Sequence, residues 1–144
     1  AAALLRSARS AEQAGLVLCL ETSLRPPRFR ELLERFGHAA VKANYDIGNS
    51  ASLGYAPDEE LAFIGRWVAC VHIKDRKRGG STVPLGKGNA DFEAVFRKLR
   101  DLDYAGHFVL QAARGADELE WTKDNAAFAR RHIATLERKN GLRA

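Results

Sequence analysis

Four polar side chains in this sequence each lie at or near the end of a short apolar run: Glu21, Asp46, His72 and Gln111. Carboxylate, imidazole and amide groups in this mixture bind divalent ions such as Mn²⁺, Mg²⁺, Co²⁺ or Zn²⁺, and a carboxylate can also act as a general base. Taken singly, each residue has an ordinary explanation, such as a helix cap, a turn or a core histidine. Because the four recur at equivalent places along the chain, the pattern favours one shared divalent-metal site.

The elements that must position these side chains can be read from the apolar pattern. Short, continuous apolar runs, which are typical of buried parallel strands, cover residues 16–20, 41–45, 68–73 and 108–110. Apolar periodicity and capping residues predict helices at residues 1–13, 27–36, 58–66, 91–102 and 118–138. This alternation predicts an α/β fold with a parallel sheet. The four polar side chains should then meet at the carboxyl ends of the strands, which in a (β/α) barrel is the face that carries the active site.

Side-chain parity predicts a role for the two cysteines. Residues two apart on a strand point to the same side, so Cys19 should lie beneath Glu21 inside the barrel. Cys70 should lie beneath His72 in the same way, and Asn44 should also face the interior. Two cysteines in apolar runs, without a secretory signal, are typical of reduced packing residues, so we expect a cytoplasmic protein. No apolar run approaches the roughly 18 residues that a membrane helix requires, so we expect no membrane partner.

Five short motifs resemble those of one known family. They are Leu-Glu-Thr at residues 20–22, Tyr-Asp-Ile-Gly-Asn at 45–49, Val-His-Ile-Lys-Asp at 71–75, Pro-Leu-Gly-Lys-Gly at 84–88 and Leu-x-Tyr-x-Gly at 102–106. Together they make the chain resemble the xylose isomerase-like TIM barrel superfamily. Within it, the chain looks most like the sugar phosphate isomerases and epimerases of the hexulose-6-phosphate isomerase type.

The resemblance implies that residues 1–144 form a single domain, the C-terminal half of such a barrel, with about four βα units. A complete barrel needs about 250 residues and eight strands, so four strands alone would leave two exposed edges. We therefore expect that a missing N-terminal half completes the barrel, that copies of the chain pair as a homo-oligomer, or that the edges are covered in some other way.

The resemblance also implies a divalent-metal-dependent isomerase or epimerase that acts on a sugar or sugar phosphate through an enediolate. The metal ligands of the family carry over to Glu21, Asp46 and His72, and Glu21 is the expected base. The fourth ligand, a second glutamate in the family, falls on Gln111, whose amide oxygen can bind metal but accepts no proton at working pH. The site should therefore hold its ion more weakly and lack a second base. A non-catalytic or truncated half-barrel homologue stays open as the alternative.

Four polar and basic residues that follow the strands are candidate substrate contacts. Lys74 and Arg78 belong to a basic run after the His72 strand, which can clamp a phosphate or a hydroxyl-rich sugar or can be an ordinary solvated loop. Asn49 follows Asp46, and it either reaches the substrate or shapes the turn. Arg114 follows Gln111 and is a further candidate.

The net charge of +5 raises nucleic acid as a weaker candidate partner. The DNA-repair endonucleases of the same superfamily bind further metal ions through additional histidines. Where the resemblance places such histidines, this chain has Asn49 and the segment Gly-Ser-Thr-Val at residues 80–83. An AP-endonuclease-like, DNA-binding function is therefore disfavoured.

Overall fold

A sheet of four parallel strands forms the centre of the molecule in the computed structural model, which describes residues 2–137. In sheet order the strands are β1 (Leu18–Leu20), β2 (Val41–Asp46), β3 (Val68–Ile73) and β6 (His107–Leu110). Every neighbouring pair in this sheet is parallel. The predicted α/β fold with four parallel strands is confirmed. The first strand is shorter than predicted, because Leu16 and Val17 precede it and are exposed.

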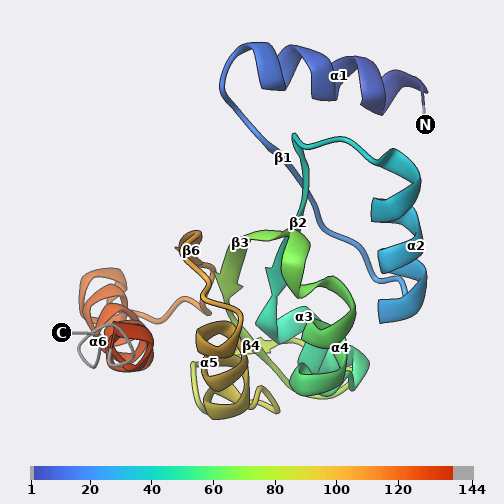
Figure 1. The fold of residues 1–144 in the computed structure, drawn as a ribbon. Helices are drawn as coiled ribbons and strands as arrows, with labels where there is room; N and C mark the ends of the chain where they lie inside the picture. The colour runs from blue at the N-terminus through green and yellow to red at the C-terminus, as the bar shows by residue number, and fades with distance from the viewer. Residues whose placement is uncertain (1, 138–144) are drawn as a thin grey trace, which may run out of the picture.

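The helices form an arc around the outside of this sheet (Figure 1). They are α1 (Ala2–Gln13), α2 (Pro26–Phe36), α3 (Ile47–Leu53), α4 (Pro57–Ile64), α5 (Phe92–Asp101) and α6 (Glu118–Glu137), and a 3₁₀ turn, η1 (Gly65–Trp67), follows α4. The first helix lies beyond the β1 edge, and α6 lies beside β6 at the other end of the arc. The last helix was predicted to reach residue 138, which lies outside the described residues. None of the described helices is long and apolar enough to cross a membrane.

The hydrophobic core lies between the sheet and the helices. Val71 and Ile73 of β3 are buried in one cluster with Tyr45 of β2, Leu61 of α4 and Phe96 of α5. Full burial of an aliphatic or aromatic side chain of this size stabilises the fold by roughly 1.5–3 kcal/mol. This packing fixes the strands against the helices and so determines where their carboxyl ends lie.

The opposite, inner face of the sheet is uncovered within residues 2–137, and we call it the open face. Cys70 and His72 of β3 and Cys19 of β1 lie on it. Cys19 is exposed and Cys70 is partly exposed, and both thiols are free. The predicted packing role of the cysteines is therefore wrong for Cys19, because no described strand faces it across a barrel interior. Val109 on the β6 edge is also 43% exposed.

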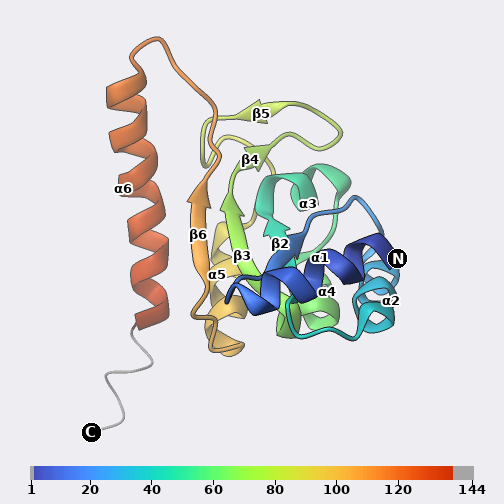
Figure 2. The ribbon, with the colours of Figure 1, turned by 90° about the horizontal axis from the view of Figure 1, so that it is seen from above.

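Two small elements that follow the strands build the carboxyl end of the sheet. Figure 2 shows the arrowheads of β2, β3 and β6 pointing toward the end that carries α3 and a hairpin of β4 (Asp75–Arg76) and β5 (Thr82–Val83). The Asp75 side chain is fully buried, and it accepts hydrogen bonds from the backbone N–H groups of Gly88 at 2.7 Å and Ala90 at 3.1 Å. A Cβ on residue 88 would collide with this carboxylate, which explains the glycine there. Asp75 thus ties the loop before α5 to the end of β3.

Candidate metal centre

Three of the four predicted side chains meet at the carboxyl end of the sheet. Glu21 follows β1, Asp46 ends β2, and His72 lies opposite Asp46 in the parallel register of β2 and β3. One ligand atom from each residue can be chosen so that all three lie within 4.8 Å of one another. His72 Nδ1 is 3.4 Å from Glu21 Oε2 and 3.7 Å from Asp46 Oδ2. The sheet therefore brings together two carboxylates and an imidazole, the donor set that the strand-end pattern selected.

Asp46 is the most buried member of this cluster, with 3% of its surface exposed. Its Oδ1 accepts a hydrogen bond from the Asn49 backbone N–H at 2.7 Å and so caps α3. Its Oδ2 has no hydrogen-bond partner in the described part of the chain, although Lys74 Nζ lies 3.5 Å away. Burial raises the pKa of this carboxyl, and the Asn49 N–H and the Lys74 charge offset part of that effect. A buried oxygen without a partner is costly, and a divalent cation between the three side chains would satisfy it, so the residues present fit such an ion.

Asn44 lies beneath the cluster and contacts two of its members. Its Nδ2 donates a hydrogen bond to Glu21 Oε2 at 2.6 Å and lies 3.1 Å from His72 Nδ1. The sequence predicted only that Asn44 faces the interior. The parity with Asp46, two residues further along β2, was the signal that could have placed it in the site.

Asn49 bridges the two carboxylates of the cluster. Besides the backbone bond to Asp46, its Nδ2 donates to Glu21 Oε1 at 2.7 Å. Both oxygens of Glu21 therefore accept a hydrogen bond from an asparagine amide, one from Asn44 and one from Asn49. Asn49, which was predicted to contact substrate, lies beside the cluster, and its amide is engaged with a candidate metal ligand.

Gln111 and Lys74 lie on the other side of the cluster, after β6 and β3. The Lys74 ammonium donates to Gln111 Oε1 at 2.8 Å and is also the cation beside Asp46. The Gln111 backbone N–H donates to the Ile73 carbonyl at 3.0 Å, which continues the β3–β6 pairing. Gln111, the predicted fourth ligand, is thus linked to the cluster through Lys74. To bind an ion, its amide oxygen would have to give up the hydrogen bond from Lys74 or accept it alongside the ion.

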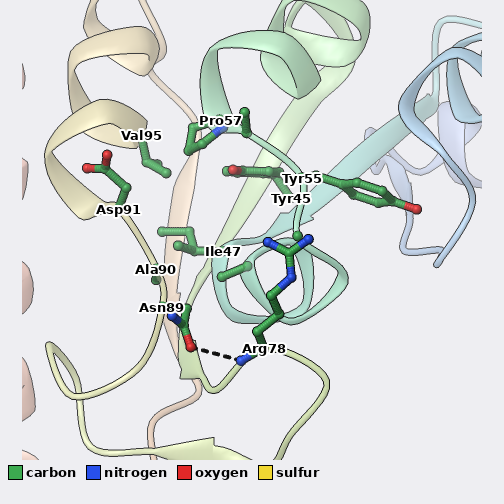
Figure 3. A pocket seen from close by; sticks show the side chains of 12 residues that line it. Tyr45, Ile47, Tyr55, Pro57, Arg78, Asn89, Ala90, Asp91 and Val95 are labelled. Carbon is green, nitrogen blue, oxygen red and sulfur yellow. Dashed lines mark hydrogen bonds between the residues drawn. The ribbon is translucent and has the colours of Figure 1, made fainter.

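Arg78, predicted as a substrate contact, lines a different pocket of about 190 Å³ (Figure 3). Its backbone N–H donates to Asn89 Oδ1 at 2.9 Å, and its guanidinium points toward Tyr55. This side chain packs against Gly54, where a Cβ would collide with it. None of the three cluster residues lines that pocket.

Arg114, the other arginine predicted to contact substrate, also lies in a pocket of its own. That pocket has a volume of about 350 Å³, lies between the end of β6 and α6, and is also lined by Trp121. The structure therefore brings Asn49 and Lys74 to the cluster and leaves both predicted arginines elsewhere.

A larger pocket of about 440 Å³ opens beside Glu21. Its wall combines hydroxyl, amide and guanidinium groups with one apolar side chain. The lining residues are Glu21, Thr22, Ser23, Asn49, Ser52, Leu53, Arg76 and Gly79. The sequence reasoning missed Arg76, because it chose Lys74 and Arg78 within the same basic run.

The sequence profile of the xylose isomerase-like TIM barrel family matches residues 1–132 of the chain. Among curated proteins, the L-ribulose-5-phosphate 3-epimerase UlaE of Salmonella paratyphi C (strain RKS4594) is 37% identical over 95 residues, which cover 58% of this chain and 33% of that protein. This chain therefore spans about a third of that relative's length.

Two solved structures show the same fold over nearly the whole chain. A xylose isomerase domain protein from Planctomyces limnophilus is 25% identical with a TM-score of 0.74, and the match covers 96% of this chain and 54% of that one. An L-ribulose 3-epimerase is 20% identical with a TM-score of 0.79, and the match covers 98% of this chain and 55% of that one. The predicted partial barrel is confirmed, since the chain corresponds to about half of each of these proteins.

Proposed function

Because the chain belongs to the xylose isomerase-like TIM barrel family, we propose that it supplies the metal site and the base of an isomerase or epimerase for a sugar or sugar phosphate. The observation that carries this proposal is the convergence of Glu21, Asp46 and His72 within 4.8 Å from three consecutive strands of the sheet. The relative UlaE, named as an L-ribulose-5-phosphate 3-epimerase, supports the reaction class and a phosphorylated substrate.

Glu21, Asp46 and His72 would hold one divalent ion, Mn²⁺, Mg²⁺, Co²⁺ or Zn²⁺, with Gln111 as a neutral fourth donor. When bound, the ion supplies positive charge that polarises the substrate carbonyl and stabilises an enediolate. The Glu21 carboxylate would remove the proton from the carbon next to that carbonyl and return it to the former carbonyl carbon. With exchange of the hydroxyl proton from one oxygen to the other through solvent, this converts an aldose into a ketose.

The surroundings of Gln111 point to a site with a single base. An amide accepts no proton, so Gln111 has no part in proton transfer. Lys74 donates to Gln111 and stands beside Asp46, so its ammonium is placed to bind an anionic oxygen of the substrate. Proton transfer through one carboxylate favours isomerisation over an epimerisation that uses two opposed bases.

The pocket of about 440 Å³ beside Glu21 is the proposed substrate site. Its hydroxyl and amide groups suit a polyol, and its volume lies within the range of about 300–1,000 Å³ that small-molecule sites occupy. Asn49 lines this pocket, whereas Lys74 lies beside it at the metal cluster, next to Asp46. Arg78 and Arg114 line other pockets and have no role in this proposal.

The open face requires a partner for the complete activity. We propose that a second half, either an N-terminal half-barrel or another copy of this chain, pairs with the edges of β1 and β6 and closes the site. Both edges are unpaired within residues 2–137, and the structural relatives are about twice as long as the matched region. The two free thiols support the cytosol as the compartment.

A non-catalytic half-barrel homologue is the second candidate function. The observation that favours it is Gln111, which stands where the family has a glutamate and is already bonded to Lys74. On this alternative the cluster would bind metal weakly or not at all, and the fold alone would be retained.

Solvent exchange separates the two candidates. The chain is incubated with Mn²⁺ and L-ribulose 5-phosphate in D₂O, and NMR follows loss of the proton on the carbon next to the carbonyl. We expect exchange above the buffer rate, reduced about 10²-fold or more in Glu21→Gln because the base is removed. The matched control, Glu59→Gln on exposed α4 surface, should exchange like the unchanged chain. Exchange no faster than in buffer would favour the non-catalytic homologue.

A further inference from the structure

Arg76 is held by the turn of its own hairpin. Its Nε and one terminal nitrogen both donate to the Gly80 carbonyl, at 3.1 and 2.6 Å. The turn is closed by a backbone bond from Gly80 N–H to Lys77 O at 2.9 Å. A second bond, from Gly79 N–H to Ser52 O at 2.9 Å, fastens it to α3. The guanidinium is half-buried and forms no ion pair with any described carboxylate, so its orientation comes from these neutral contacts.

The remaining terminal nitrogen of Arg76 donates to Asn49 Oδ1 at 2.9 Å. A guanidinium carries only hydrogen-bond donors, so the Asn49 amide must turn its oxygen toward Arg76. The NH₂ group of Asn49 must then point the opposite way, where it donates to Glu21 Oε1 at 2.7 Å. Without the guanidinium, the amide could flip and present its oxygen to the carboxylate, which would repel it.

Glu21 needs such a restraint because its own element is short. It follows a strand of three residues at the edge of the sheet, and its side chain is 38% exposed. Asn44 holds one of its oxygens from beneath, and Asn49 holds the other. A base or ligand acts efficiently only when its geometry is fixed before the reaction.

We propose that Arg76 is a positioning residue for Glu21 and acts through the amide of Asn49. Nothing in this role requires Arg76 to touch the substrate or the ion. The β4–β5 hairpin is the anchor of this relay, since Asp75 beside Arg76 is fully buried and bound to the loop before α5. The inference rests on the proposed function in that it takes Glu21 as a metal ligand and base.

A thermodynamic cycle on Mn²⁺ affinity tests the relay without substrate. Calorimetry gives the dissociation constant of the chain, of Arg76→Gln, of Asn49→Ala and of the double variant. Loss of an outer hydrogen-bond partner of a ligand weakens metal binding by about 10–100-fold, so each single variant should fall in that range. The double variant should bind Mn²⁺ no more weakly than the weaker-binding single variant, because both substitutions remove the same restraint. Lys77→Gln, an exposed change in the same turn, is the control and should bind like the unchanged chain.

A second readout needs no metal. The side-chain ¹H–¹⁵N signals of Asn49 should show slow hydrogen exchange in the unchanged chain and in Lys77→Gln, and fast exchange in Arg76→Gln. Equal Mn²⁺ affinity in Arg76→Gln together with unchanged Asn49 signals would overturn the inference, as would fully additive losses in the double variant. If the unchanged chain binds no Mn²⁺, the proposed function fails, whereas the Asn49 signals still decide the relay.

Discussion

The two faces of the sheet differ in burial and in the chemical groups of their side chains. On the helix side, Val71 and Ile73 are buried in the core, whereas on the open face their neighbours Cys70 and His72 are partly exposed. The helix side therefore provides stability, and the open face provides the chemical groups. The core on the helix side holds the strands in place, whereas the groups on the open face lie where a covering partner would contact them.

Two substitutions on opposite faces of β3 should differ strongly in their effect on the free energy of unfolding. Ile73 is 1% exposed, and its truncation in Ile73→Ala should cost about 2–5 kcal/mol of unfolding free energy through lost burial and a cavity. Cys70→Ala, on the open face of the same strand, should cost less than about 1 kcal/mol. Urea unfolding followed by circular dichroism measures both. Similar losses in the two variants would mean that something packs on the open face.

Glu60 offers a second comparison, because it is a carboxyl buried on the packed side of the sheet. Burial raises its pKa to about 7 from 4.5, and a bond from Ser50 offsets part of this. The folded state therefore holds the proton more tightly than the unfolded state, and stability should fall as pH rises from about 4.5 to about 7, by roughly 3 kcal/mol at most. Glu60→Gln should remove this loss, and Glu59→Gln, an exposed change on the same helix, should retain it. Unfolding measured from pH 4.5 to 8 gives the result, and identical pH profiles for the two variants would contradict the burial argument.

A smaller effect, on Mn²⁺ affinity, is expected at Gln111, the residue that follows β6. Gln111→Glu restores a carboxylate beside the cluster and exchanges a neutral donor for a charged one. We expect Mn²⁺ to bind about tenfold more tightly, which corresponds to about 1.4 kcal/mol. Calorimetry detects a change of this size. An unchanged affinity would show that residue 111 does not face the ion.

Most of the fold followed from local patterns in the sequence. Apolar runs and helical periodicity located the four strands and all the helices except α3, because elements buried on one side carry apolar residues at a regular spacing. The strand ends also located Glu21, Asp46 and His72. The helix α3 was missed, because its seven residues include Gly, Asn and two Ser and form no apolar stripe. Its capping residue, Asp46, was already assigned to the metal site. In the structure one oxygen of Asp46 caps α3, and we propose that the other oxygen binds the ion.

The parts that could not be predicted depend on contacts between distant segments. Strands of two residues, such as β4 and β5, are too short to leave a periodic pattern. The choice between Arg76 and Arg78 depended on this hairpin, which turns Arg76 toward Asn49 and Arg78 toward Gly54. The exposure of Cys19 could not be predicted either. Side-chain alternation shows which face of a strand a residue lies on, but not what packs against that face.

We propose that His72, with Glu21 and Asp46, binds a divalent ion on the open face. The most direct measurement is calorimetric titration of the metal-free chain with Mn²⁺, beside His72→Ala and the control His107→Ala, an exposed histidine on β6. We expect one ion per chain in the unchanged protein and in His107→Ala, and a loss of binding of at least about 100-fold, or about 2.7 kcal/mol, in His72→Ala. Equal Mn²⁺ affinity in the two histidine variants, or no binding by a folded, unchanged chain, would contradict the account.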